Sequence, residues 1–330
     1  MKLSGLERRG RAGLTGVLGG SIVIGAVLVL ALLPTTSVAA QFTAASVSSC
    51  SVGSDPWAPA YDPVNHEVYV PNFLSNSVTV LKGTCTVAAT ISLGTGSYPS
   101  SAAFNPINND VYVTDMALNQ VYVISGTKVV STITDSSFDG PRGIVFDPAG
   151  PAMCVANYNG DSVSFIGPTN IVAFAYPVGD GPIGIDYDPY WDTINVVNSD
   201  SNNVTVFDGF TFAHLGDVPV GGGPIGVAFD IVDDLDYVTN YQTNSVSVIS
   251  DTSNIETIKG FDHPGELTWS QSELALYVPN VGNGKVFVVS GYSIVKKIST
   301  ADSAYFATYD DSNDKVYVTN TDTNSVYVLS

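Results

Sequence analysis

A seven-residue phrase, Asp236–Gln242, recurs in altered form about every 42 residues from Tyr61 to the last residue. An aromatic residue marks each copy, at Tyr61, Phe104, Phe146, Tyr187, Phe229, Trp269 and Tyr309. Proline stands five residues earlier in the first six copies, and Ala304 takes its place in the seventh. A repeat of this length built from strand-like units is the signature of a β-propeller. The count predicts seven blades.

Each copy has room for four short strands. In the fifth copy we expect them at Gly226–Phe229, Asp236–Thr239, Ser245–Ile249 and Ile255–Lys259. Their content of β-branched and aromatic residues fits strands. The second strand is apolar on both faces, which is typical of a strand that is covered on both sides. The chain is therefore predicted to be all-β, with four-stranded blades that stack on one another.

The seventh copy ends at Ser330, directly after its third strand at Val326–Leu329. The segment Phe42–Ser49 precedes the first copy and is similar to fourth strands such as Val87–Leu93. An N-terminal strand that completes the last blade would remove two open sheet edges. We expect the ring to close in this way.

Polar residues punctuate the turn between the second and third strands. The first polar position is Asn72, Asp115, Asn157, Asn198, Asn240, Asn280 and Asn320, and another Asn, Asp or Gly follows four residues later. Asn and Asp side chains bond to nearby backbone N–H groups and tolerate a left-handed backbone. These residues are predicted to make turns, although a ring of polar turns that binds a ligand is an open alternative.

The phrases at Tyr237–Asn240 and Tyr317–Asn320 resemble the YVTN family of β-propeller repeats, as do the triplets Asn244–Val246 and Asn324–Val326. The resemblance covers residues 42–330. It implies a seven-bladed propeller of archaeal type that is exported or held at the cell surface. It implies no single activity, because the members of this family share none.

The N-terminus differs from the repeats. Residues 1–11 are basic, and residues 12–33 form an uncharged apolar run of about 33 Å as a helix, which is enough to span a bilayer. The basic flank predicts that the N-terminus lies inside and the propeller, residues 42–330, outside the cytoplasm. Residues 34–41 form a linker with small residues that would suit cleavage near Ala40. A signal anchor is favoured, and a secreted form after cleavage is the alternative.

The chain has 12 basic and 31 acidic residues. Without residues 1–41 the balance is 8 basic against 30 acidic, because four basic residues and Glu7 are removed. A domain of this charge repels phosphate backbones, which excludes nucleic acid as an expected partner. Charged residues make up only 13% of the chain. Such a surface also fits a habitat of low external pH, because protonation would only neutralise it.

Three cysteines are too few for a disulfide framework. Cys50 is expected near the end of the N-terminal strand and Cys85 at the start of the first blade's outer strand. If these strands run the same way, the two residues lie at opposite rims, too far apart for a bond. The sequence therefore predicts no bridge, with Cys154 as a small buried hydrophobe.

When the seven copies are aligned, each repeat position forms a column of equivalent residues. The first strands are expected to line a central channel, and at its mouth four polar residues occupy columns whose other members are apolar or small, namely Arg142, Asp186, His263 and Glu266. Glu266 beside His263 would suit a general acid or base, and a solvated charge in a wet channel is the alternative interpretation. Arg142 and Asp186 would form a structural link between neighbouring blades. These four are weak catalytic candidates, and an enzyme built on them would be a lyase or hydrolase.

No metal or cofactor is expected, because His66, His214 and His263 fall in different parts of the repeat. The acidic loop Asp230–Asp236 lacks the spacing of a calcium loop and is predicted to be solvated. Asn203 begins the one Asn-x-Ser/Thr sequon and is a candidate for glycosylation. The expected function is a non-enzymatic binding or scaffold module for protein or glycan partners at the cell surface, attached to the membrane only through its N-terminal segment. A propeller enzyme and an envelope-layer structural protein are the alternatives.

Overall fold

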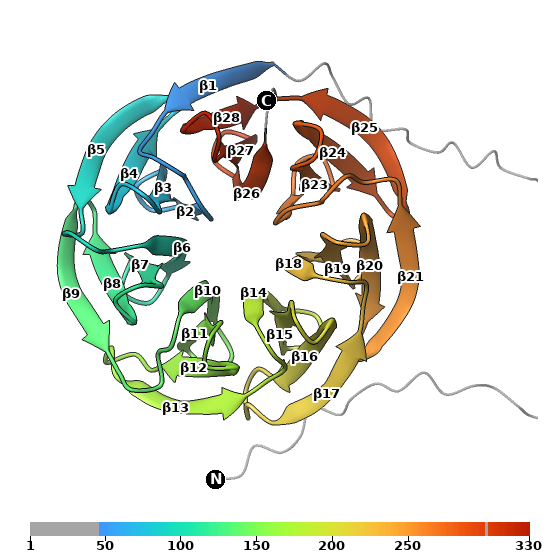
Figure 1. Cartoon of the computed structure of the whole chain (residues 1–330), viewed down its shortest axis with the longest axis horizontal. Helices are drawn as coiled ribbons and strands as arrows, with labels where there is room; N and C mark the ends of the chain where they lie inside the picture. Colours follow the sequence, from blue (N-terminus) through green and yellow to red (C-terminus); the bar gives the residue numbers. More distant parts are fainter. Residues whose placement is uncertain (1–45, 301–302) are drawn as a thin grey trace, which may run out of the picture. The chain divides into compact units, whose positions relative to one another are not determined.

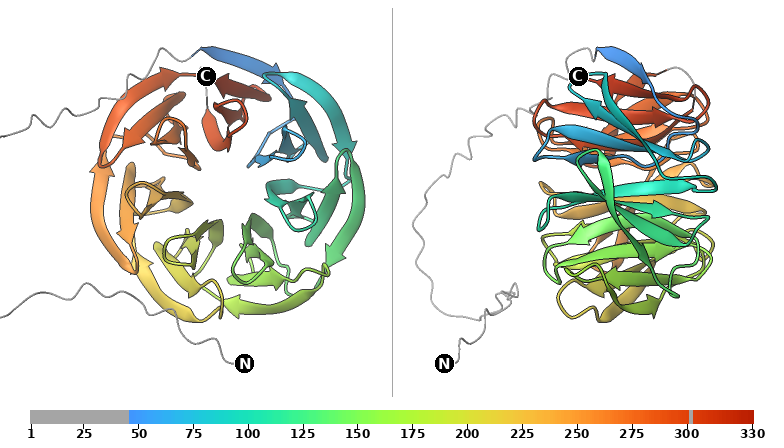
Figure 2. Two further views of the ribbon diagram at one scale, coloured as in Figure 1. Left: turned by 180° about the vertical axis from the view of Figure 1, so that it is seen from behind. Right: turned by 90° about the vertical axis from the view of Figure 1, so that its left-hand side faces the viewer.

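The computed structural model describes residues 46–300 and 303–330. They form seven four-stranded antiparallel sheets that stand as blades around a ring (Figure 1), so the prediction of an all-β seven-bladed propeller is confirmed. The view from behind shows the same radial arrangement, and the side view shows the ring edge-on (Figure 2). The blades are numbered here from blade 1 (β2–β5) to blade 7 (β26–β28 and β1).

The strands of each blade occupy four positions from the centre outwards. The first, inner strands are β2 (Ala60–Asp62), β6 (Pro99–Asn105), β10 (Pro141–Asp147), β14 (Pro182–Asp188), β18 (Pro224–Asp230), β22 (Thr268–Ser270) and β26 (Ala304–Asp310). The second are β3 (Glu67–Asn72), β7 (Asp110–Asp115), β11 (Ala152–Asn157), β15 (Thr193–Asn198), β19 (Leu235–Asn240), β23 (Ala275–Asn280) and β27 (Lys315–Asn320). The third are β4 (Ser77–Lys82), β8 (Gln120–Ser125), β12 (Ser162–Ile166), β16 (Asn203–Asp208), β20 (Ser245–Ser250), β24 (Lys285–Ser290) and β28 (Ser325–Leu329). The outer strands are β1 (Val47–Ser51), β5 (Thr86–Ser92), β9 (Lys128–Thr134), β13 (Val172–Pro177), β17 (His214–Pro219), β21 (Ser253–Lys259) and β25 (Ser293–Ser299).

The N-terminal strand β1 is the outer strand of blade 7. It pairs antiparallel with β28, from Val47 opposite Leu329 to Ser51 opposite Ser325. The closure predicted from the truncated seventh copy is therefore confirmed. The strand itself lies at Val47–Ser51, a little later in the chain than the expected Phe42–Ser49.

The core lies between neighbouring sheets, where second and third strands are buried on both faces. Between blades 5 and 6, for example, Tyr237 and Val248 of one sheet pack with Leu276 and Phe287 of the next. The tyrosine of the repeated phrase also has a polar role, because the Tyr237 hydroxyl donates to the Gly291 carbonyl oxygen of the adjacent blade at 3.1 Å. The same residues thus recur in each copy because they stack the blades: each blade covers a face of the next.

The polar turn residues join the blades as well as turning the chain. The first member of each pair is fully buried, so these seven side chains present no surface to a ligand. The left-handed backbone falls on the second member, for example Asn244 at φ 54°. Its side-chain oxygen accepts the His263 N–H of the next blade at 2.7 Å. Four other turns make the same bond, through Asn119, Asp161, Asn202 and Asn324.

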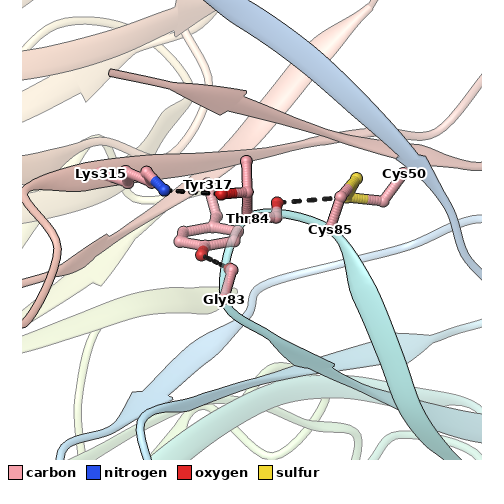
Figure 3. The surroundings of a disulfide bond; sticks show 6 residues. All are labelled: Cys50, Gly83, Thr84, Cys85, Lys315 and Tyr317. Carbon is pink, nitrogen blue, oxygen red and sulfur yellow. Dashed lines mark hydrogen bonds between the residues drawn. A yellow bond between two sulfur atoms is a disulfide. The ribbon is translucent and has the colours of Figure 1, made fainter.

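Cys50 and Cys85 form a disulfide with a Cα–Cα distance of 5.4 Å, so the prediction of no bridge is wrong (Figure 3). Both strands do run the same way around the ring. However, the outer strands are tilted so far by the twist of each blade that they lie along the circumference, and the end of β1 meets the start of β5 (Figure 1). The bond therefore crosses the seam between blades 7 and 1. Cys154 in β11 is free and buried, as predicted.

The assignments of residues 1–11, 12–33 and 34–41 fall outside the described residues. In the part of the chain that the structure does describe, no helix is long and apolar enough to cross a membrane.

Candidate functional site

The seven first strands line the centre of the ring (Figure 1). Because every blade has the same topology, the seven first strands all run in one direction. They start at the face that carries the repeated prolines, which we call the proline column (Ala304 in the last blade), and they end at the opposite face. We call these the proline face and the cavity face. Neighbouring first strands approach closely, as the parallel bridge between Ala58 and Ser101 and the bond from the Glu266 N–H to the Tyr305 carbonyl oxygen (2.8 Å) show.

This close approach explains why small residues stand two positions after most of the repeated prolines. A Cβ atom added at Gly143 would stand 2.1 Å from the Ile183 carbonyl oxygen, so no side chain fits there. Glu266 occupies the same column in blade 6. Its side chain lies against Gly226 of blade 5, where an added Cβ atom would come within 2.9 Å of the Glu266 Cγ atom. Glycine at position 226 therefore makes room for a carboxyl group inside the channel.

Arg142 lies at the start of β10, between two aromatic rings. Its guanidinium carbon is 4.8 Å from the centre of the Trp57 ring and 5.1 Å from that of Tyr158. Within the described chain its guanidinium has no carboxylate within 4.0 Å and no hydrogen-bond acceptor. Burial lowers its pKa, and the nearby charge of Glu266 acts against this shift. The ring contacts are cation–π interactions, which hold the charge without neutralising it.

Asp186 and Glu266 are half-buried carboxyl groups on the same channel. Burial raises the pKa of each to about 7. Bonds from the backbone N–H groups of Tyr187 (2.9 Å) and Phe229 (3.2 Å) to the Asp186 carboxylate lower its pKa in part. For Glu266 the positive charge of Arg142 does the same, while Asp186 raises the pKa further. The structure thus places three of the four candidates in one electrostatic group, and Asp186 bonds to backbone where a link to Arg142 was expected.

His263 stands apart from this group. It lies on the proline face with φ 50°, and its Nδ1 atom is 3.0 Å from Asp262 Oδ1. Its ring packs edge-on against Tyr241 at 4.8 Å. No hydrogen bond joins His263 to Glu266 among the described residues, so the imidazole–carboxyl pair suggested by the sequence is not assembled here.

Aromatic side chains surround Arg142 on the proline face. Trp57 stacks on Phe73 at 4.3 Å and packs with Phe306 at 5.6 Å. The contacts continue from Phe73 to Tyr98 (4.9 Å), from Phe306 to Tyr305 (4.5 Å) and from Tyr305 to Tyr241 (6.4 Å). We call this surface the aromatic face; it consists of Trp57, Phe73, Tyr98, Tyr158, Tyr241, Tyr305 and Phe306 from blades 1, 2, 3, 5 and 7.

Sequence reasoning missed this face because its members come from different columns of the repeat. Trp57 and Tyr305 directly follow the proline column, whereas Phe73, Tyr158 and Tyr241 directly follow the first polar residue of a turn. The second column contains Met116, Ser199, Val281 and Thr321 in the other blades. An aromatic residue at a half-buried turn position was the available signal.

At the opposite end the channel widens into a cavity of about 490 Å³, which we call the channel cavity. Asp186 and Glu266 both line it, and Glu266 also borders the narrow space beside Arg142. Its walls are mainly aliphatic and aromatic, including Tyr61, Phe104, Phe229, Trp269 and Tyr309. Polar atoms nevertheless make up more than half of the surface exposed in the cavity, so carboxyl and other polar groups lie among aliphatic and aromatic side chains. A pocket that combines such side chains with a few convergent polar groups is the usual form of a small-molecule site.

The remaining candidates do not converge. No group of three His, Cys, Asp or Glu side chains suited to a metal ion occurs within residues 46–300 and 303–330. In the acidic loop, Asp230 accepts backbone N–H groups from Val232 and Asp233, and the buried Asp236 accepts from Asn195 at 3.0 Å. Asn203 begins β16, where its side-chain oxygen accepts from Asn198 at 2.8 Å. It lines a groove of about 450 Å³ between the outer strand of blade 3 and the third and outer strands of blade 4.

No protein-family description and no curated protein matches the chain. Among solved structures, the chain is similar to a streptogramin B lyase, with a TM-score of 0.77 and 12% identity over 87% of this chain and 98% of the other. A virginiamycin B lyase from Staphylococcus aureus gives a TM-score of 0.76 and 12% identity, over 87% and 99% of the two chains. A catalytically inactive histidine-to-alanine variant of that lyase with quinupristin gives 0.76 and 13%, with the same coverage. At this identity the likeness shows the fold: the chain is a seven-bladed β-propeller.

Proposed function

We propose that this protein is a non-enzymatic binding module and that the aromatic face holds its ligand. The observation that carries the proposal is the continuous set of ring contacts around Arg142, from Tyr98 through Trp57 to Tyr241. None of these rings belongs to a column that is aromatic in all seven blades, so stacking of the blades does not require them. Aromatic and Arg side chains are the residues that most often anchor ligands and partners.

A glycan is the partner class that this surface fits best. Tyr98 is 42% exposed, and Trp57, Phe73, Tyr158, Tyr241 and Tyr305 are half-buried, so their faces are accessible while their positions are fixed by packing. Exposed or half-buried carboxylates stand beside the rings at Asp55, Asp200 and Asp262. Flat aromatic surfaces pack against sugar rings, and carboxylates accept bonds from sugar hydroxyls.

The test is retention of the purified protein on a panel of immobilised envelope polysaccharides. We expect at least one to retain the protein, and we expect Trp57→Ala and Tyr241→Ala to weaken retention roughly tenfold or more. Phe210→Ala is the matched control, because this aromatic residue is 71% exposed and lies away from the aromatic face. Equal retention of all four proteins, or retention of none, would contradict the proposal, and specific capture of an envelope protein would favour a protein partner.

An extracytoplasmic location is part of the same proposal. The Cys50–Cys85 disulfide supports it, because such bonds persist in oxidising compartments. The resemblance to YVTN repeats and the apolar run at residues 12–33 support it as well. Labelling of intact cells with a membrane-impermeant reagent tests the location, and protection of the propeller until lysis would refute it.

A propeller lyase or hydrolase is a second candidate, favoured by the channel cavity. Glu266 borders this cavity with a pKa of about 7, which suits a general acid or base near neutral pH. The solved neighbours include lyases, one of them with quinupristin. Incubation with quinupristin separates the two functions: a pure binding module leaves the compound intact, whereas turnover that Glu266→Gln abolishes would establish the enzyme.

A further inference from the structure

We propose that the channel cavity binds an organic ammonium cation. This site lies at the other end of the channel from the aromatic face and does not depend on the function proposed for that face. Asp186 and Glu266 provide negative charge inside the cavity, and the exposed Asp311 also lines it. Both stand where the other blades carry small or mainly apolar residues; in blade 5, for example, Ala228 occupies the position equivalent to Asp186 and Gly226 the position equivalent to Glu266.

The two carboxyl groups lack a cationic partner in the described chain. Among the described residues, no Lys, Arg or His nitrogen lies within 4.0 Å of either carboxyl group, and the Glu266 side chain makes no hydrogen bond. Arg142, the positive charge that acts on Glu266, is held between Trp57 and Tyr158 on the proline side. Asp186 accepts two backbone N–H groups and keeps further acceptor capacity. The side of both carboxyls that faces the cavity is therefore open to a cationic ligand.

The walls of the cavity suit an alkylated cation. Five aromatic side chains line it, from blades 1, 2, 5, 6 and 7. Aromatic faces attract quaternary and primary ammonium groups and tolerate their methyl or methylene surface. A volume of about 490 Å³ accommodates a small organic molecule.

A bare metal ion fits these walls less well. Calcium requires six to eight oxygen ligands and magnesium a near-ideal octahedron. The carboxyl groups that line the cavity are Asp186, Glu266 and Asp311, and within the described residues they do not form a group of three suited to a metal ion. The net charge of the whole chain is −19, which favours a positively charged ligand. A cleft with acidic groups and apolar walls concentrates the field and attracts cations.

Binding should depend on pH in a defined direction. A cation favours the ionised form of Asp186 and Glu266, whose pKa values lie at about 7 in the free protein. Affinity is therefore expected to rise between pH 6 and pH 8, with uptake of the cation linked to release of protons. The other titratable or charged groups that act on these two carboxyls include Arg142 in β10, Asp188 in β14, Asp236 in β19 and Tyr305 in β26. Asp311, Tyr61 and Tyr309 line the same cavity.

The experiment is calorimetric titration of the full chain with choline and with 3,3-dimethylbutan-1-ol, which has the same shape without the charge. We expect choline to bind at pH 8 at least about tenfold more tightly than the alcohol, which corresponds to about 1.4 kcal/mol. We expect Glu266→Gln and Asp186→Asn each to weaken choline binding about tenfold. Asp217→Asn removes the same charge at the outer groove and should change it less than twofold.

Equal affinity for choline and the alcohol would overturn the proposal, as would the absence of choline binding up to tens of millimolar. A loss in Asp217→Asn as large as in Glu266→Gln would overturn it too, because it would show only a general effect of net charge. Thermal melts identify a variant that fails to fold, and Asp186→Asn then carries the test if Glu266→Gln does not fold. Calcium is titrated as a further probe, and tighter binding of calcium than of choline at the same two residues would refute the ammonium assignment.

Discussion

At the scale of single residues, the informative positions are those where the repeat fails. Arg142, Asp186 and Glu266 place charges in columns that are otherwise small or mainly apolar. Burial of such groups costs free energy, as the raised pKa values of the two carboxyls and the lowered pKa of Arg142 show. Stacking of the blades does not require these charges, since the other blades stack without them. These charged groups lower the stability of the fold and are not needed for packing, which points to a role in binding.

Glu266→Gln should change the pH dependence of stability in a defined direction. The pKa of Glu266 is about 7 in the folded chain against 4.5 for the ordinary group, so the folded state holds this proton more tightly. Stability contributed by the protonated group is complete below pH 4.5 and is lost as the pH rises towards 7. Relative to the parent, the variant should gain up to about 3 kcal/mol between pH 4 and pH 8.

Chemical denaturation at the two pH values measures this difference. Glu256→Gln is the control, since Glu256 is exposed on β21 and the substitution removes the same charge. A constant gap between the Glu266→Gln variant and the parent across this range would contradict the prediction. The direction agrees with the expectation from composition that the surface fits a habitat of low external pH.

At the scale of strands, the repeat predicted most of the fold. Aligned copies placed the strands of the fifth blade within a few residues of β18, β19, β20 and β21, because each strand occurs seven times in the same register. The same alignment failed for Cys50 and Cys85. A linear register states the direction of a strand but not its tilt, and the tilt of the outer strands is what brings the end of β1 to the start of β5.

Reduction of the Cys50–Cys85 bond should destabilise the propeller. The bond closes a loop over a sequence separation of 35 residues, for which the chain-entropy relation gives about 4 kcal/mol. It also pins β1, which is the strand that closes the ring. We expect a lower Tm for the parent after treatment with dithiothreitol.

Cys85→Ser is the matched control for this measurement. Its Tm should equal that of the reduced parent and should not respond to dithiothreitol, because Cys154 is buried and unpaired. An unchanged Tm after verified reduction would show that the bond does not stabilise the closing strand.

At the scale of the whole molecule, the ring has two chemically different ends. The proline face carries aromatic rings around Arg142, and the cavity face carries carboxyl groups among aliphatic and aromatic side chains. The sequence predicted that Arg142, Asp186 and Glu266 lie at the channel. It did not predict the aromatic face, because Trp57 and Tyr241 become neighbours of other rings only when seven blades close into a circle. Contacts across the ring depend on blade number and tilt, which no single copy encodes.

Closure of the ring also predicts how the molecule unfolds. Without β1, the third strand β28 becomes an open edge and blade 7 loses the strand paired from Val47 to Ser51. Deletion of residues 46–51 should therefore lower the Tm by more than Cys50→Ser does, because the point variant loses only the disulfide while the deletion also loses the pairing. An open edge pairs readily with other chains, so the deleted protein should associate, and light scattering during sedimentation or chromatography measures this. If the deletion and Cys50→Ser melt together as monomers, the bond alone closes the ring and the paired strand contributes nothing.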